Sequence, residues 1–153
     1  MHSTLVIIHS LLRWVILALI LFKLYQAYSG WFGKKEWTPL DKKVSIFSII
    51  AVDTQLLIGL ILYFGTGPYF KMLTSKAKVV MKNGVLRFWA VEHIFMMIIA
   101  VILIHVGHAL SKRAEDSILK HKKAAIFFTI GLLLMLAAIP WPFMKAARPL
   151  LPF

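Results

Sequence analysis

Four long apolar runs, separated by short polar connections, dominate the chain. They cover about residues 5–28, 44–64, 85–110 and 124–143. A helix needs roughly 20 residues to cross about 30 Å of hydrocarbon, and a helix satisfies its own backbone hydrogen bonds, as lipid requires. The pattern therefore predicts an all-α, integral membrane four-helix bundle of up-down-up-down topology, with residues 1–153 forming a single transmembrane domain.

The connections differ in character. Gly30, Gly33 and Pro39 break helix in the first one, and the longest one extends from Gly65 to Gly84. Within the longest connection, residues 69–82 contain four lysines among apolar side chains. This predicts a short basic helix lying on the lipid headgroups.

Composition agrees with a membrane protein and narrows its chemistry. Hydrophobic residues make up 60% of the chain, against roughly 45–50% in soluble domains. The net charge of +12 comes from basic clusters between the apolar runs, which favours contact with anionic lipid headgroups over binding of nucleic acid. The absence of cysteine excludes disulfides, thiolate-held iron–sulfur clusters and covalently attached c-type haem.

Loop charges predict an orientation. The side of the membrane holding the first and third connections carries ten Lys and Arg residues, and the side holding the termini carries seven. The positive-inside rule then places both termini in the periplasm of a bacterial inner membrane. Because the N-terminus has no basic region before its apolar run, we expect that run to be retained as a helix.

Two histidines lie at matching depth in the first and third helices, which run in the same direction. His9 is about five residues into the first helix and His93 about seven into the third, so their depths differ by only a few ångström. Two such histidines can ligate one haem iron axially without any cysteine, and this pair is also the candidate metal site. The alternative is that each histidine only hydrogen-bonds to a neighbouring helix.

A second site is a weaker prediction. His108 lies fifteen residues after His93, near the opposite end of the third helix, and His121 precedes the fourth apolar run on the same side. Both are candidate cofactor ligands there. The alternative is that they are interfacial residues close to lipid phosphates, as His105 would be.

Charged residues within the spans need partners, because an isolated charge in hydrocarbon is costly. Arg13 and Asp53 match in depth, so we expect a structural ion pair between them, with Gln55 or Ser10 satisfying remaining groups. Arg13 lies four residues from His9 and shares its helix face, so it is also a candidate for holding a haem propionate, and Asp53 for a proton or quinone route. Glu92 is expected to meet Arg87 or a loop lysine.

Other chemistry has less support. Met96 and Met97, close after His93, could form a soft copper site with His9, although methionines on a helix usually pack. The chain has no Ser–His–Asp arrangement, phosphate-binding glycine loop or zinc-protease motif, so neither a hydrolase nor an ATPase is predicted.

Four motifs carry a resemblance to a known family. They are HSLLRW at 9–14, QLLIGL at 55–60, RFWAVEH at 87–93 and IPWPF at 139–143. Over nearly the whole chain this pattern resembles a family of small four-helix Bacteroidota membrane proteins labelled cytochrome b or cytochrome b-like. The resemblance implies haem b and electron transfer, with His9 and His93 as ligands. The chain departs from dihaem cytochromes b because its second histidine pair is incomplete.

The leading hypothesis is therefore a b-type haem protein that takes part in electron transfer, more an electron carrier or subunit than a stand-alone enzyme. Its expected partners are the lipid bilayer and a quinone or redox subunit, in a homo- or hetero-oligomer. The first alternative is a non-haem accessory subunit of a membrane complex, and the second is a copper-handling protein.

Overall fold

A computed structural model describes residues 2–149 and 151, which form an all-α bundle. The four long helices are α1 (His2–Phe32), α2 (Pro39–Leu60), α6 (His93–Arg113) and α7 (Ser117–Ala138). Three short helices, α3 (Tyr69–Ser75), α4 (Ala77–Lys82) and α5 (Gly84–Arg87), connect α2 to α6. Two π-helical segments, η1 (Ile61–Thr66) and η2 (Phe88–Glu92), extend α2 and precede α6.

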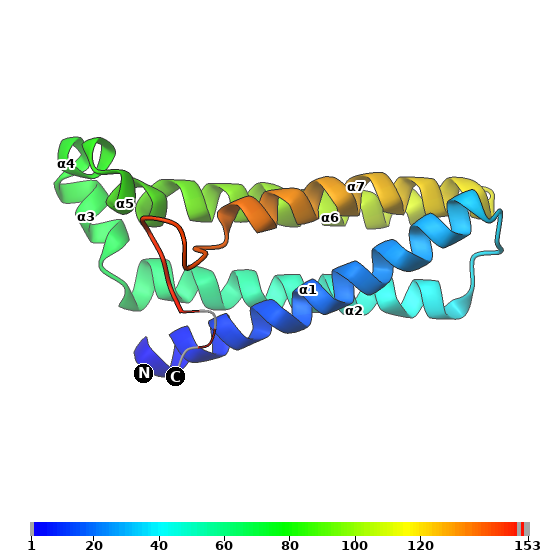
Figure 1. Cartoon of the computed structure of the whole chain (residues 1–153), viewed down its shortest axis with the longest axis horizontal. Helices are drawn as coiled ribbons and strands as arrows, with labels where there is room; N and C mark the ends of the chain where they lie inside the picture. The colour runs from blue at the N-terminus through cyan, green and yellow to red at the C-terminus, as the bar shows by residue number, and fades with distance from the viewer. Residues whose placement is uncertain (1, 150, 152–153) are drawn as a thin grey trace.

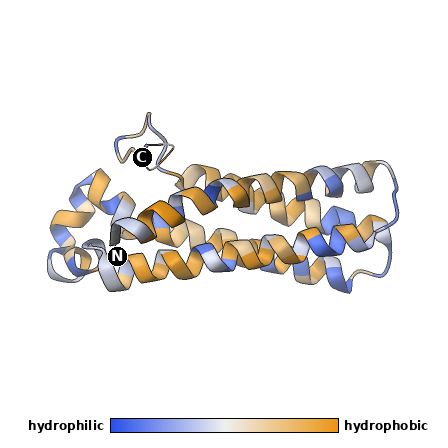
Figure 2. Cartoon of the chain, turned by 90° about the horizontal axis from the view of Figure 1, so that it is seen from below, coloured by the Kyte–Doolittle hydropathy of each residue, from blue (hydrophilic) through white to orange (hydrophobic). Residues whose placement is uncertain are grey.

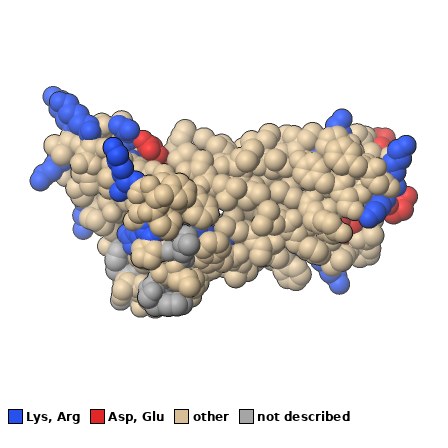
Figure 3. All heavy atoms as spheres, viewed as in Figure 1, with Lys and Arg blue, Asp and Glu red and all other residues tan. Residues whose placement is uncertain are grey.

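The long helices alternate in direction, and the start of α1 and the segment after α7 lie at the same end of the bundle as α3–α5 (Figure 1). Four helical stretches are long and apolar enough to cross a membrane: Ser3–Phe32, Pro39–Thr66, Gly84–Arg113 and Ser117–Ala138. Apolar residues cover most of their length (Figure 2), and on the face seen in Figure 3 the charged side chains gather at the two ends. The predicted multi-pass, all-α membrane bundle is thus confirmed.

The fourth helix differs most from its predicted bounds. It begins at Ser117, because the Asp116 carboxylate caps it by accepting from Leu119 N at 2.8 Å. It ends at Ala138 and does not continue to residue 143. Ile139 is extended (φ −70°, ψ 130°), as expected for a residue before proline.

The second helix also begins before its predicted start. Thr38 and Asp41 form a reciprocal capping box, and Pro39 occupies the first turn, where a missing N–H costs nothing. These local signals explain why the helix begins five residues before the apolar run does.

The core lies where α1, α6 and α7 meet along the bundle axis. Its fully buried members include Ile20 of α1, Ile104 of α6 and Phe128 of α7, with Val52 added from α2. Toward the end that holds the termini, the packing opens into a cavity between the helices.

Candidate cofactor site

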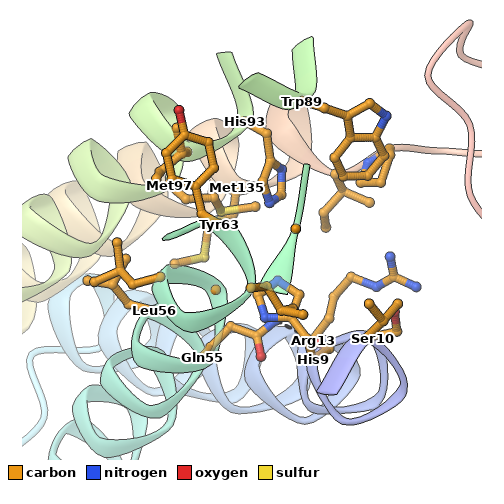
Figure 4. Close-up of a pocket in the computed structure, with 18 of the residues that line it drawn as sticks. His9, Ser10, Arg13, Gln55, Leu56, Tyr63, Trp89, His93, Met97 and Met135 are labelled. Atoms are coloured by element: carbon orange, nitrogen blue, oxygen red, sulfur yellow. Dashed lines mark hydrogen bonds between the residues drawn. The ribbon is translucent and has the colours of Figure 1, made fainter. Parts of the chain in front are cut away.

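A cavity of about 320 Å³ lies between α1, α2, α6 and α7, within the size range of small-molecule sites. Its lining is mostly apolar, with a few polar and sulfur-bearing side chains directed inward (Figure 4): His9, Ser10, Arg13, Gln55, Tyr63, His93, Met97 and Met135. Residues from all four of the sequence motifs therefore line this one cavity.

His9 and His93 face each other across this cavity, as their matching depths predicted. Their ring centroids are 6.4 Å apart, and the ring planes are inclined by 66°. His9 reaches in from α1 and His93 from the start of α6 (Figure 4). This separation is within the range of an edge-to-face ring contact, so the two imidazoles are neighbours in the cavity lining.

The end of α7 fixes the orientation of His93. Its Nδ1 lies 2.8 Å from the carbonyl oxygen of Ala138. A carbonyl can only accept, so Nδ1 carries the proton and Nε2 keeps a free lone pair. A backbone acceptor behind one ring nitrogen is the usual arrangement of a metal-binding histidine.

Two prolines make the Ala138 carbonyl available. In a continuing helix, the carbonyls of residues 136 and 138 would accept from the N–H groups of residues 140 and 142. Both of those residues are proline and have no N–H. Side chains replace the missing donors: Trp141 Nε1 donates to Leu136 O at 2.8 Å, and His93 takes Ala138 O.

Gly59 provides space for His9. A Cβ atom at Gly59 would lie 3.2 Å from His9 Cε1, which is tighter than an ordinary contact. The Gln55 amide donates to the His9 carbonyl at 2.8 Å and joins α2 to α1 at this level. His9 Nδ1 is buried, and within residues 2–149 it has no hydrogen-bond partner.

The two π-helical segments meet beside the cavity. The Tyr63 hydroxyl in η1 donates to the Ala90 carbonyl in η2 at 2.6 Å. η2 ends immediately before His93, so this bond couples the end of α2 to the turn that presents the ligand candidate. Single π-helical turns are frequent at functional sites.

Two arginines contribute positive charge at the cavity. Arg13 and Arg148 both line it, and Arg148 places its guanidinium carbon 4.9 Å from the Trp89 ring centroid. The segment after α7 thus returns across the cavity. The Glu92 carboxylate pairs with Arg87 at 2.6 Å, as predicted, and not with either of these two arginines.

The predicted Arg13–Asp53 ion pair is a point of disagreement. The Asp53 carboxylate lies 3.3 Å from His105 Nε2, and the ion pairs of the described residues do not include Arg13 with Asp53. Matching depth fixes position along a helix but not around it. Gln55 points into the cavity, and Asp53, two residues earlier and therefore about 200° away, points outward.

The second predicted site is not assembled as a ligand pair. His121 lies inside α7, buried against Gly30, with its ring centroid 4.9 Å from that of Trp37. Among the described ring contacts, none joins His108 to His121. His121 also lines a second cavity of about 310 Å³, together with Gln26, Gly30 and Asp41.

Sequence reasoning missed the burial of Lys23 at this end. Lys23 is fully buried, donates to Asp41 O at 3.1 Å and lies 4.1 Å from the Trp37 ring centroid. A lysine in a membrane-spanning helix ordinarily extends its ammonium group toward the headgroups. The signal that could have identified it is the nearby tryptophan and aspartate in the connection.

The described part of the chain contains no group of three or more His, Asp or Glu side chains able to hold a metal ion. The site is thus a histidine pair with apolar and cationic surroundings. No protein-family model, curated protein or solved structure matches this chain, so the resemblance to cytochrome b-like proteins stays a prediction.

Proposed function

We propose that this protein binds one b-type haem between His9 and His93 and takes part in electron transfer within the membrane. The observation that carries the proposal is the opposed pair of imidazoles, one of which has its Nδ1 engaged by a carbonyl. Haem brings four iron ligands of its own, so a pair of histidines from the protein is sufficient.

The ring separation agrees with this role. A metal–imidazole nitrogen bond is about 2 Å long, so His9 and His93 would have ring centroids about 6 Å apart if both held one metal ion. The observed separation is 6.4 Å. Direct hydrogen bonding between the rings would bring them closer together.

The surroundings also suit a group that is apolar with a charged edge. Leu56, Met97 and Met135 supply apolar lining, while Arg13 and Arg148 supply positive charge for two propionates. When bound, haem supplies a centre that accepts and releases one electron. The protein's own part is to hold the ring nitrogens in place, exclude water and balance the propionate charge.

The cavity is lined by His9 near the start of α1 and by Arg148 after α7, and both segments lie at the α3–α5 end of the bundle (Figure 1). With the orientation expected from loop charges, this is the periplasmic side of a bacterial inner membrane. We propose that electrons pass there to a quinone or to a redox partner subunit. A non-haem accessory subunit is the alternative if the histidines serve packing alone.

Copper handling is a second candidate, because thioether sulfur favours copper(I). Met97 and Met135 both line the cavity with the two histidines. Met96 is absent from that lining, so only part of the predicted methionine set is in reach. Metal analysis of the purified protein distinguishes copper from iron.

Alanine replacements at His9 and His93 test the haem proposal. We expect either change to abolish a low-spin b-type spectrum while the protein still inserts in the membrane and remains helical. His108→Ala is the matched control, since His108 is on α6 but outside the cavity, and it should retain the spectrum. A normal spectrum in His9→Ala and His93→Ala would overturn the proposal.

A further inference from the structure

A polar pair interrupts the apolar outer surface between α2 and α6. Asp53 Oδ1 lies 3.3 Å from His105 Nε2, and the side chains are 49% and 44% exposed. On α2, Ile50 and Leu57 flank Asp53 on the same exposed face, and on α6 the neighbouring Ile102 is exposed as well. These apolar side chains are suited to lipid, so the pair lies in a lipid-facing surface.

Asp53 is close to the middle of its span. It comes 14 residues after Pro39 and 13 before Thr66, counting 53 − 39 and 66 − 53. At about 1.5 Å per residue, it is about 20 Å from either end, while half of the hydrocarbon thickness is about 15 Å. Simple extension to the headgroups is therefore beyond the reach of this short side chain.

The contacts of His105 indicate how many protons the pair holds. Its Nδ1 lies 3.0 Å from the Val101 carbonyl of the preceding turn, which can only accept, so Nδ1 is protonated. Two lone pairs facing each other at the 3.3 Å between Nε2 and the carboxyl oxygen would repel, so the contact needs one further proton, on the imidazole or on the carboxyl. Either arrangement has zero net charge, which hydrocarbon tolerates far better than an anion.

The apolar parts of α2 and α7 offer no other titratable partner for His105. Asp53 is the only titratable residue of α2 between Lys43 and Leu60, and α7 has none after Lys123.

The cationic groups on the neighbouring helices have other contacts. On α1, Arg13 lines the haem cavity and Lys23 donates to a backbone carbonyl. On α6, His108 and Lys112 follow His105 toward the end of the helix, and within residues 2–149 and 151 the ion pair of Asp53 is with His105.

We propose that His105 and Asp53 form a proton-binding site within the membrane-spanning part of the bundle, open to the lipid phase, in which imidazole and carboxylate share one proton. Neither residue lines the cavity between His9 and His93. The inference is therefore independent of haem binding, and the two proposals can fail separately.

Dicyclohexylcarbodiimide, an apolar reagent that enters bilayers, tests the site. It reacts with a protonated carboxyl group: the carboxyl oxygen adds to the carbodiimide carbon, and the proton moves to a nitrogen. The acyl group then shifts to the other nitrogen and gives a stable N-acylurea. Nothing leaves, so the modified peptide gains the mass of one whole reagent molecule.

The full chain in phospholipid nanodiscs is treated with the reagent and mapped by mass spectrometry. We expect modification at Asp53. The exposed loop residue Glu115 is the internal comparison and should stay unmodified, because it is in contact with water. Absence of modification at Asp53 would overturn the proposal.

His105→Leu distinguishes a shared proton from an isolated carboxyl group. Without imidazole, the proton cannot move to a neighbouring base and an anion facing lipid is costly, so modification of Asp53 should be more extensive than in the wild type. His108→Leu, one turn further along α6, is the matched control and should leave the extent of modification unchanged. An extent in His105→Leu identical to that of the wild type would refute the sharing of the proton.

Discussion

Gly30→Ala tests the close approach of α1 to α7 at His121. A Cβ atom at Gly30 would overlap with His121 Cγ, Cδ2 and Cε1. The ring is only 2% exposed and packs against Trp37 on another side. Alanine therefore forces repacking of a buried cluster.

The magnitude follows from two opposing effects. Adding a methyl group that overlaps buried neighbours costs about 1–3 kcal/mol, and the upper end applies because three ring atoms are affected. Alanine in place of glycine within a helix returns about 1 kcal/mol. We therefore expect Gly30→Ala to lower the free energy of unfolding by about 2 kcal/mol, measured by reversible unfolding in mixed micelles.

Two further variants isolate the cause. Gly84→Ala is the control, because a Cβ there meets nothing within 4 Å, and its effect should stay within about 0.5 kcal/mol. In a His121→Ala background, Gly30→Ala should be neutral or stabilising, which gives a coupling energy of about 2 kcal/mol. An equal cost of Gly30→Ala in both backgrounds would refute the reasoning.

The same unfolding measurement checks three other interactions. Trp141→Phe should cost about 1–3 kcal/mol, because the Leu136 carbonyl loses its only side-chain donor in the described structure; an unchanged free energy would contradict this capping role. Lys23→Met should be about 2 kcal/mol milder than Lys23→Ala, because methionine refills the buried volume of the stem, and equal losses would contradict it. Arg87→Met should cost less than about 1 kcal/mol, because its pair with Glu92 is partly exposed; a loss of several kcal/mol would show that the pair is buried.

The sequence predicts how deep a residue lies along its helix, but not the direction in which its side chain points. Counting residues from the helix starts correctly predicted that His9 and His93 lie at the same level. The same counting paired Arg13 with Asp53, and there it was wrong, since helical phase directs Asp53 outward to His105. The direction in which a side chain points around its helix depends on how the helices pack, and residue counting does not give that packing.

The bond between His93 and Ala138 shows a second kind of limit. The sequence predicts which carbonyls lack donors, because Pro140 and Pro142 have no N–H. It does not say which side chain from elsewhere supplies the replacement. That identity depends on α6 and α7 lying side by side, a tertiary fact that local pattern does not contain.

The most direct test of the central claim is a reduced-minus-oxidised absorption spectrum of the gently purified full chain, with haem and iron measured on the same sample. Opposed His9 and His93 rings predict a sharp low-spin b-type α-band and about one haem iron per chain. A flat spectrum from folded protein, purified after haem is supplied during expression, would contradict the account.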